Sequence, residues 1–263
     1  MNRVIDFQDV TWKRQGKLIL YDINWNVAKG EHWAILGLNG SGKTTLLNMI
    51  NGYIWPTTGN VTILNQVFGK TDIRELRKSI GWVSSSLQAR IRETLLTEDI
   101  VISGKYASIG LYDTPTAGDF EKARELMEQL GCIHLKGRTY QTCSQGEKQK
   151  ILIARGLMAS PDILILDEPT NGLDFIAREE LLTAINFMTT EENTPTIIFV
   201  THHMEEILPL FSNTLLLRDG TVFAKGKTEE VVNSKPLSAF FSKNVEVEWR
   251  NKRPWLVPVT CRK

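Results

Sequence analysis

The sequence has no long apolar run. Its most apolar stretches, such as TIIFV and ILIL, have the length of a strand, whereas a helix needs about 20 apolar residues to cross a bilayer. The start, MNRVIDFQDV, includes charged residues and lacks the apolar core of a signal peptide. If the protein works at a membrane, we therefore expect another chain to span it.

Cysteine is scarce, and charges of the two signs are balanced. The three cysteines, Cys132, Cys143 and Cys261, are too few and too widely spaced for a disulfide framework, and no Cys and His spacing resembles a zinc site. A reduced, cytoplasmic compartment is the simplest interpretation. The formal net charge is only +1, so the sequence gives no indication of a broad basic surface for nucleic acid.

What the sequence does contain is an ordinary globular composition, with 263 residues of which 42% are hydrophobic. Strand-like runs fill residues 3–36, a mainly helical pattern extends from about 85 to 159, and strands return after Pro161. This order predicts an α/β fold in which a helical segment interrupts a β-rich lobe. The expected division is one domain over 1–235, with a core lobe of about 1–84 and 151–235 and a helical subdomain of about 85–150, followed by a tail over 236–263.

GLNGSGKT, at residues 37–44, matches the phosphate-loop pattern G-x-x-x-x-G-K-[ST]. It follows a strand, WAIL, and opens a helix, a context that disfavours an incidental glycine-rich turn. Glycines let backbone N–H groups curve around phosphate oxygens, and the helix points its positive end at the anion. Lys43 would reach the β- and γ-phosphates, and Thr44 would offer its hydroxyl to Mg²⁺. The residues predicted to hold the nucleotide here are Gly37, Leu38, Asn39, Gly40, Ser41, Gly42, Lys43, Thr44 and Thr45.

Two further strands end in residues that suit this chemistry. ILILDEP is a buried strand that delivers Asp167 and Glu168 at its carboxyl end, where ligands gather in open α/β sheets. Asp167 would hold Mg²⁺ through water, and Glu168 would accept a proton from the attacking water or orient it. TIIFV ends in THH, which places His202 and His203 at another strand end, where a His would reach the γ-phosphate.

With these motifs, the sequence resembles the nucleotide-binding subunits of ABC (ATP-binding cassette) transporters over about residues 3–235. That family has a phosphate loop, a signature run, an Asp-Glu strand, an Asp loop and a switch His in this order. The matching runs here are GLNGSGKTT, CSQGE, ILILDEP, NGLD and TH. The resemblance implies a P-loop NTPase cassette with a RecA-like core lobe and an inserted helical subdomain, which binds ATP and Mg²⁺ and hydrolyses ATP.

The signature run gives a meaning to the polar stretch TCSQGEKQK. In the family this run from one subunit faces the γ-phosphate held by the other, so that two chains sandwich two ATP molecules. By resemblance, Ser144 would contact the phosphate, Gly146 would permit its close approach, and the helix that starts there would direct its dipole at the anion. CSQGE departs from the common L-S-G-G-Q at Cys143, Gln145 and Glu147. Glu147 adds negative charge near the site unless it points outward from the helix.

Three other positions carry over from the family one at a time. Trp12 stands where the family places an aromatic that stacks on adenine, and a core tryptophan is the alternative. Asp174, in NGLD, would communicate between the two sites. His202 matches the switch His better than His203 does, because it directly follows the strand-ending Thr201.

One position departs clearly from the family pattern. After I-G-[YF]-V the family has Pro-Gln, and that Gln touches Mg²⁺ or the attacking water and links the site to the helical lobe. Here IGWVSSSLQ gives Ser84 and Ser85, and Gln88 lies three residues beyond Ser85. Either Ser85 acts through a water, or the loop is displaced and Gln88 substitutes, and the first reading is slightly favoured. Coupling to a transport partner is the property that this departure most puts in doubt.

The resemblance implies a transport motor in which two cassettes, identical or sister chains, close on ATP and drive a transmembrane permease. LKGRTYQT, before CSQGE, lacks the acidic-glycine run typical of exporters, which favours an importer. The chain would then be cytoplasmic and peripheral at the inner face of the cell membrane through its partner, with no direct contact to nucleic acid. VSSSLQ, VISGKYASIGLY and the tail further resemble a molybdate-type bacterial subgroup of ModF-like and YlmA-like ATPases, although nothing in these residues selects molybdate.

Two alternative functions stay open. One is a soluble, non-transport ABC ATPase that acts on ribosomes, nucleic acid or a regulatory partner. Translation factors of this kind carry two cassettes in one chain and DNA-repair relatives insert coiled coils, whereas this sequence has one cassette and no sustained heptads. The other is a binding-only ATP sensor, which Glu168 disfavours because it supplies the water-activating carboxylate.

The tail, VEVEWRNKRPWLVPVTCRK, is basic and contains Trp249 and Trp255. It either docks a partner or membrane surface or folds back onto the domain, and the second is the simpler expectation.

Overall fold

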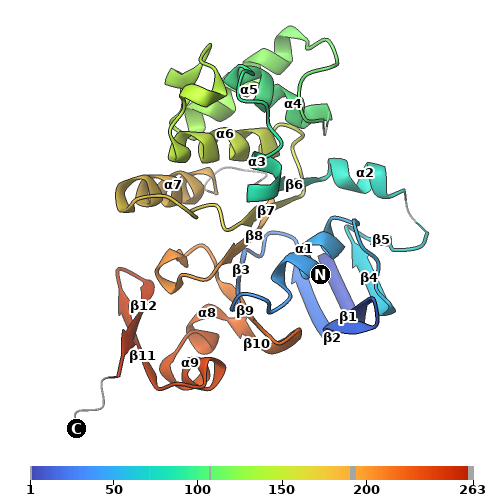
Figure 1. The fold of residues 1–263 in the computed structure, drawn as a ribbon, viewed down its shortest axis with the longest axis vertical. Helices are drawn as coiled ribbons and strands as arrows, with labels where there is room; N and C mark the ends of the chain where they lie inside the picture. Colours follow the sequence, from blue (N-terminus) through green and yellow to red (C-terminus); the bar gives the residue numbers. More distant parts are fainter. Residues whose placement is uncertain (1, 71, 107, 190–193, 260–263) are drawn as a thin grey trace. The chain divides into compact units, whose positions relative to one another are not determined.

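The computed structural model describes residues 2–70, 72–106, 108–189 and 194–259. They form two compact units: Met1–Asp72 with Ile197–Lys263 make up the first unit, and Ile73–Thr196 make up the second (Figure 1). Parallel strands and helices occur in both units, which confirms the predicted α/β class. Within the described residues, no helix combines the length and the apolar character that crossing a membrane requires.

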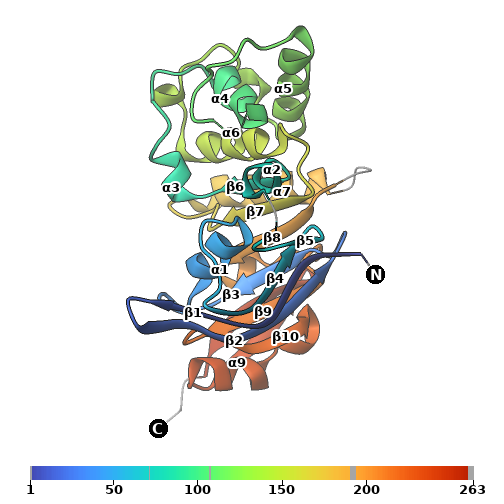
Figure 2. The same cartoon turned by 90° about the vertical axis from the view of Figure 1, so that its right-hand side faces the viewer.

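The first unit contains two sheets and a C-terminal hairpin. Its strands are β1 (Arg3–Arg14), β2 (Lys17–Ala28), β3 (Trp33–Leu36), β4 (Thr58–Ile63), β5 (Gln66–Val67), β8 (Thr196–Thr201), β9 (Asn213–Arg218), β10 (Thr221–Lys227), β11 (Val245–Arg250) and β12 (Arg253–Pro258). One sheet is antiparallel with the order β2-β1-β4-β5, and Figure 2 shows its long strands side by side. In the other sheet β9, β3 and β8 are parallel neighbours, and β10 pairs antiparallel with β9.

The helices of the first unit are α1 (Lys43–Ile50), α8 (Thr228–Val231), α9 (Ser234–Phe241) and the 3-10 helix η4 (Met204–Glu206). Four two-residue turns close its hairpins, and both residues of each turn have positive φ, as type I′ turns require. They are Gln15-Gly16, Leu64-Asn65, Asp219-Gly220 and Asn251-Lys252.

The second unit combines a parallel pair of strands with a group of helices. Its elements are α2 (Ile73–Lys78), β6 (Ile80–Val83), α3 (Ser85–Gln88), α4 (Thr97–Ser103), η1 (Gly104–Tyr106), α5 (Ala117–Gln129), η2 (Ile133–Leu135), η3 (Tyr140–Thr142), α6 (Gln145–Leu157), β7 (Ile163–Asp167) and α7 (Phe175–Met188). α6 packs against α4, α5, α7 and β6, and its residues 151–154 are fully buried as a result. The four apolar residues of β7 are also fully buried, as a strand covered on both faces requires.

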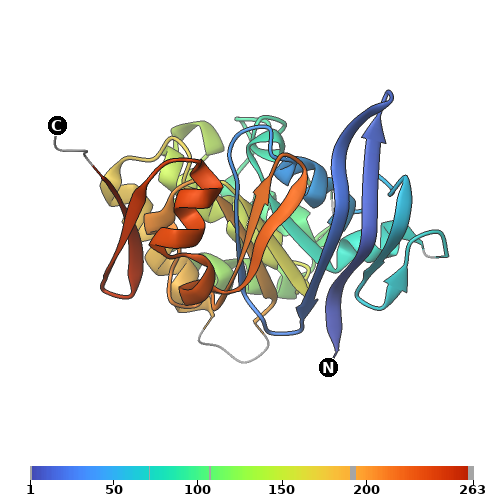
Figure 3. The same ribbon diagram turned by 90° about the horizontal axis from the view of Figure 1, so that it is seen from below.

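The C-terminal tail folds back onto the first unit, the simpler of the two expectations. β11 and β12 form a hairpin beside α9 (Figure 3), and Ser234 Oγ of α9 accepts a hydrogen bond from the Val247 N–H at 3.0 Å. From β12, Arg253 Nε donates to the carbonyl oxygen of Glu205 in η4 at 2.6 Å. The hairpin is thereby joined to the segment that follows β8.

Candidate functional site

The phosphate loop of the first unit joins β3 to α1. All four residues of β3 are buried and paired between β8 and β9, which fixes where the loop begins. Gly42 is the N-cap of α1 with a φ of 105°, and a Cβ there would lie 2.7 Å from Leu20 Cδ2, so the position favours glycine. Among the described residues no side chain caps α1, and its own first turn has no acidic residue. The positive end of α1 is therefore neither capped by a side chain nor neutralised by an acid of its own first turn, which suits an anion.

Lys43 and Ser41 place a cation and a hydroxyl inside this loop. The buried Lys43 ammonium donates to the carbonyl oxygens of Gly37, at 2.7 Å, and Leu38, at 3.3 Å. Ser41 is buried, and its Oγ has no hydrogen-bond partner among the described residues. A buried hydroxyl without a partner is costly, so the loop suits an anion that accepts from both groups. Of the other predicted loop residues, Leu38, Asn39, Gly40 and Thr44 are exposed and Thr45 is half-buried.

The predicted switch His leaves the same sheet edge as the phosphate loop. β3 and β8 are parallel with Leu36 opposite Thr201, so the loop and His202 both follow strand ends at one edge. Thr201 Oγ1 donates to the buried Glu206 carboxylate at 2.5 Å and accepts from the His203 N–H at 3.0 Å. These bonds fix the turn after β8. His202 is exposed, with its ring 4.2 Å from that of His203.

Trp12, the predicted adenine-stacking residue, lies on β1 opposite Leu20 of β2. Its side chain is half-buried, whereas Trp25 and Trp33 are buried and their rings meet edge to face. A partly exposed ring retains a face on which a base can stack. Trp12 is therefore distinct from these two core tryptophans.

In the second unit, the predicted acidic pair and the departing serine loop leave one sheet edge. β6 and β7 are parallel with Val83 opposite Leu166, so Ser84 and Asp167 lie at neighbouring strand ends. Glu168 has a φ of 50°, a left-handed conformation that costs energy for a residue other than glycine. Strained backbone of this kind clusters at functional sites. The Glu168 carbonyl oxygen accepts from the Asn171 N–H at 3.1 Å, which closes the turn after β7.

The serine loop after β6 is ordered by its own side chains. Ser84 is buried and caps α3, because its Oγ accepts a hydrogen bond from the Leu87 N–H at 3.3 Å. Ser85 is the first residue of α3 and is exposed. An exposed hydroxyl can act through a water, the favoured role for Ser85.

Gln88, the alternative to Ser85, is bound to α6, here called the signature helix. Its side-chain amide and that of Gln145 exchange two hydrogen bonds, at 3.1 and 3.2 Å. Gln149 Nε2 donates to the same Gln88 oxygen at 3.0 Å. We call these three side chains the glutamine clasp. Ser85 and Gln88 thus belong to one short helix, and the structure connects Gln88 to the signature run.

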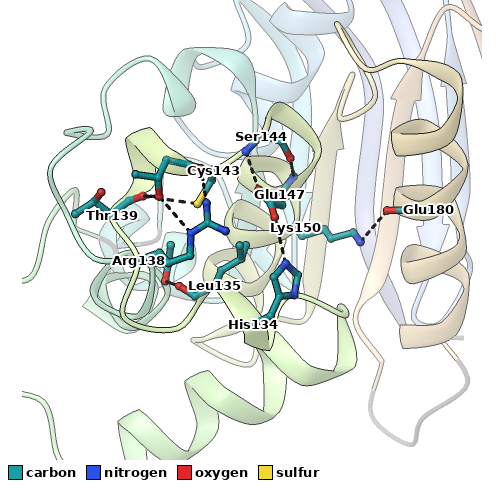
Figure 4. A network of polar contacts seen from close by, with 11 residues as sticks. His134, Leu135, Arg138, Thr139, Cys143, Ser144, Glu147, Lys150 and Glu180 are labelled. Atoms are coloured by element: carbon teal, nitrogen blue, oxygen red, sulfur yellow. Dashed lines mark hydrogen bonds and ion pairs between the residues drawn. The ribbon is translucent and has the colours of Figure 1, made fainter.

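The signature helix begins with a capping box that involves Ser144 and Glu147 (Figure 4). Ser144 Oγ accepts from the Glu147 N–H at 3.3 Å, and the Ser144 N–H donates to the Glu147 carboxylate at 2.7 Å. The other carboxylate oxygen lies 3.1 Å from His134 Nε2. Partial burial works against ionisation, but the hydrogen bonds from Ser144 and His134 together lower the pKa of Glu147. Both oxygens of the Glu147 carboxylate therefore have partners in this chain, the Ser144 N–H and His134.

Gly146 and Asp174 belong to one helix contact. Gly146 is buried, and a Cβ there would lie 3.2 Å from Ala177 Cβ of α7, so the missing side chain lets α6 and α7 pack closely. Asp174 is exposed and caps α7, accepting from the Ala177 N–H at 2.9 Å. Farther along the same two helices, Lys150 Nζ lies 3.6 Å from Glu180. The structure thus brings the signature run and the Asp loop together.

Cys143, which replaces the usual leucine of the signature run, is a buried small side chain. Its Sγ lies 3.8 Å from the Thr139 carbonyl oxygen, and burial raises the pKa of the Cys143 thiol (Figure 4). Burial also raises the pKa of Cys132 to about 12. Protonated, buried thiols are poor nucleophiles and poor metal ligands, so Cys143 acts here as a hydrophobic residue.

Several residues of these sites were given no role from the sequence. Glu206 fixes the turn after β8, His134 binds Glu147, and Gln145 and Gln149 bind Gln88. Gln145 and Gln149 are four residues apart, a spacing that places them on one helix face and would have been a usable signal. His134 has no comparable signal, because its contact with Glu147 depends on how α6 packs beside η2, and the five-residue spacing of Thr201 and Glu206 follows no helix or strand repeat.

The chemistry of the donors can be tested against Mg²⁺, the metal that the fold family implies. No cluster of three or more His, Cys, Asp or Glu side chains suited to a metal occurs in the part of the chain that the structure describes. Mg²⁺ does not need one, because it is usually bound by one or two protein oxygens together with water and substrate phosphates. The exposed Thr44 hydroxyl and the half-buried Asp167 carboxylate are hard oxygen donors of this kind. These residues fit the metal.

Comparison with known proteins gives a consistent result. The family model described as ABC transporter matches residues 20–171. An uncharacterized ABC transporter ATP-binding protein, YlmA of Bacillus subtilis, is 50% identical over 98% of this chain and 99% of its own. YmeB of Lactococcus lactis, described in the same words, is 42% identical over 97% and 98%. The molybdate import ATP-binding protein MolC of Haemophilus influenzae is 28% identical over 92% and 89%.

Solved structures are similar along most of the chain. CbiO1 of Clostridium perfringens, part of the ABC transporter complex cbiONQ, has a TM-score of 0.79 and 27% identity over 91% of this chain and 94% of its own. The cassette MJ0796, in a dimeric post-hydrolysis state bound to ADP and Pi, has a TM-score of 0.71 and 25% identity over 85% and 98%.

Proposed function

The chain belongs to the ABC transporter family of ATP-binding subunits and is an ATPase, and we propose that it powers import through a permease as half of a cassette dimer that closes on ATP. ABC ATP-binding subunits pair as dimers and work with a transmembrane permease. The observation that carries the proposal is the start of α1, where a helix end without a side-chain cap, the Lys43 ammonium and the Ser41 hydroxyl suit a phosphate.

In the proposed reaction, residues of the first unit bind the nucleotide. Lys43 exchanges its carbonyl partners for the β- and γ-phosphates, and the loop amides enclose the same oxygens. Trp12 stacks on adenine, and His202 contacts the γ-phosphate. The exposed position of His202 and the half-exposed ring of Trp12 support these roles.

Residues of the second unit handle the attacking water. Glu168 accepts its proton as the new bond to the γ-phosphorus forms and the bond to the bridging oxygen breaks, which yields ADP and phosphate. Ser85 orients the water through its exposed hydroxyl. Thr44 and Asp167 would hold Mg²⁺, whose positive charge would offset the charge on the phosphate oxygens.

The signature run serves the ATP held by a second cassette. The Ser144 hydroxyl and the start of the signature helix bind the γ-phosphate of that ATP. Asp174 lies beside this run through the Gly146–Ala177 contact, which supports its role in communication between the two sites. Whether the second cassette is an identical or a sister chain follows from the composition of the isolated complex.

Import is the proposed direction of transport. MolC, whose name refers to molybdate import, is 28% identical, and LKGRTYQT lacks the acidic-glycine run of exporters. The predicted YlmA likeness is confirmed, whereas the molybdate-type label stays a prediction because substrate selection would fall to the permease and a binding protein. Through the permease, the chain would lie at the cytoplasmic face of the membrane.

The Glu168→Gln substitution tests this proposal. Removing the proton acceptor should lower ATP hydrolysis by about 10²- to 10⁴-fold. ATP binding should be retained, so that closed dimers accumulate with ATP and are seen by sedimentation velocity. Hydrolysis at the wild-type rate in Glu168→Gln would contradict the role of Glu168.

Affinity isolation of the same variant with ATP, from solubilised cells of its source, identifies the partner. A multi-span membrane protein in the isolate would support the transport function and name the permease. Its absence, together with recovery of ribosomes, nucleic acid or soluble proteins, would support the non-transport alternative.

A further inference from the structure

We propose that Gln88 is a positioning residue: through the glutamine clasp it holds the start of the signature helix in place for the ATP of the second cassette, and it does not itself contact nucleotide. This inference rests on the proposed function, because it concerns the role of the signature run in a closed dimer. It goes beyond that function by assigning a role to Gln145, which departs from the family pattern.

The first argument is the geometry of the clasp. Gln88 and Gln145 donate to each other, at 3.1 and 3.2 Å, so that two primary amides face each other as a closed pair. Gln145 lies between Ser144 and Gly146 in the signature run. A side chain that binds Gln145 therefore sets the position of the run itself.

The second argument is the burial of Gln149. This side chain is 4% exposed, and its Nε2 donates to the Gln88 oxygen at 3.0 Å. Its own Oε1 has no hydrogen-bond partner among the described residues. Moving Gln88 away would leave both ends of a buried amide unpaired, which is costly, so the clasp favours a fixed position of α3 against α6.

The third argument is what lies at the other end of α3. This helix has only four residues and follows β6 through the buried Ser84 cap. Ser85 and Gln88 are its first and last residues, so a displacement of Ser85 would carry Gln88 with it. The clasp therefore links the serine loop to the signature run within one subunit.

A direct contact between Gln88 and nucleotide would require a different arrangement. The Gln88 oxygen already accepts from Gln145 and Gln149, and its nitrogen donates to Gln145. Reaching a metal or a water in the active site would break all three bonds. The two roles predict different results when Gln88 and Gln145 are changed together.

The experiment uses the full-length Glu168→Gln chain as parent and replaces Gln88 by methionine, which keeps the length of the side chain but makes no amide pair. The ATP-dependent dimer should dissociate about tenfold more readily in the Gln88→Met variant, as expected if the displaced signature run loses about one hydrogen bond to the γ-phosphate of the second cassette. Gln145→Met should have a similar effect. Because the two residues act as one pair, the dimer of the double variant should dissociate no more readily than the dimer of the more affected single variant. ATP affinity of the monomer, measured with a fluorescent ATP analogue, should not change.

Two further variants separate positioning from a general effect on the fold. Gln141→Met changes an exposed glutamine of the same unit and should leave the dimer unchanged. Gln88→Glu keeps the two accepted hydrogen bonds but sets a carboxylate oxygen against the acceptor Gln145 Oε1, so its dimer should also dissociate more readily than that of the parent. Loss of the clasp should lower the melting temperature of the monomer by only a few degrees, about 2–4 °C per kcal/mol, so that the variants stay folded at the temperature of the dimer assay.

Three results would overturn the inference. An unchanged dimer in Gln88→Met would exclude a positioning role. Additive effects of Gln88→Met and Gln145→Met, or a weaker ATP affinity of the Gln88→Met monomer, would mean that Gln88 acts directly at nucleotide. Absence of ATP-dependent dimers in the Glu168→Gln parent would instead overturn the proposed function, and the positioning role with it.

Discussion

Helices α1 and α6 both start at segments to which the family assigns phosphate, yet the two starts are built differently. α1 has a glycine N-cap, no side-chain cap among the described residues and no acid in its first turn. α6 has a capping box in which Ser144 and Glu147 satisfy each other's backbone N–H groups, and Glu147 adds a negative charge. The positive end of α1 has no side-chain cap and no acid of its own, whereas the capping box of α6 already satisfies N–H groups and places a negative charge at its helix start.

This difference suggests that the two helix starts contribute to phosphate binding in different ways. We expect the start of α1 to bind phosphate by itself, because Lys43 and Ser41 are already placed in the loop. The start of α6 is stable without any ligand, and its exposed Ser144 hydroxyl is the group it can still offer. The glycines at the two helix starts also differ in what they do. Gly42 shapes the phosphate loop at positive φ, whereas Gly146 permits α6 to pack closely on Ala177 of α7.

The largest expected effect belongs to the uncapped start. Lys43→Ala removes the cation from the phosphate cradle and should weaken ATP binding about 100-fold, because hydrogen bonds to charged groups are among the strongest. Titration of the monomer with a fluorescent ATP analogue measures this. The matched control is Lys235→Ala, an exposed lysine of the same unit, which should bind as the wild type does. Equal binding by Lys43→Ala and the control would remove the proposed difference between the two helix starts.

Substitution at the capped start of α6 should have a smaller effect on ATP hydrolysis. A second capping box in the same unit, at the start of α5, provides the control. Thr116 and Asp119 cap α5 in the same way as Ser144 and Glu147 cap α6. Ser144→Ala and Thr116→Ala should each cost about 1 kcal/mol of stability in urea unfolding. Only Ser144→Ala should also lower ATP hydrolysis, by about tenfold, with monomer ATP affinity unchanged. Similar hydrolysis rates in the two variants would make the cap of α6 purely structural.

The smallest expected effect concerns the charge of Glu147. Hydrogen bonds from Ser144 and His134 lower its pKa in the folded chain against the opposing effect of burial, so ionised Glu147 stabilises the fold at neutral pH. That contribution is present above the usual carboxyl value of 4.5 and is lost as the pH falls through the lowered folded value. Glu147→Gln should therefore be less stable than the wild type by less than about 1 kcal/mol at pH 7, and the difference should shrink in acid.

Urea unfolding of both chains at neutral and at acidic pH measures this difference. Glu121→Gln, an exposed change on α5, serves as the control. A difference between wild type and Glu147→Gln that stays constant from pH 7 into acid would show that the charge of Glu147 does not stabilise the cap.

The parts of the site that could be predicted from the sequence are those encoded by short spacing. The phosphate loop and the Asp-Glu pair after an apolar strand each depend on neighbours within a few residues, so the pattern determines the local geometry. The glutamine clasp joins residues 57 and 61 positions apart, and Glu147 meets His134 across 13 positions. Such contacts depend on how helices pack, which no local pattern specifies. The order of strands and helices predicts the fold class, but it carries no information about these partners.

The C-terminal hairpin has a practical consequence. Arg253 of β12 holds the Glu205 carbonyl oxygen, three residues beyond His202, so the last strand that the structure describes supports the turn of the predicted switch His. A chain shortened before β11, or one with a purification tag fused directly after β12, would disturb that support while leaving every recognisable motif intact. Loss of activity in such a shortened or tagged chain would then be mistaken for a property of the cassette, and an amino-terminal tag is the better choice for purification.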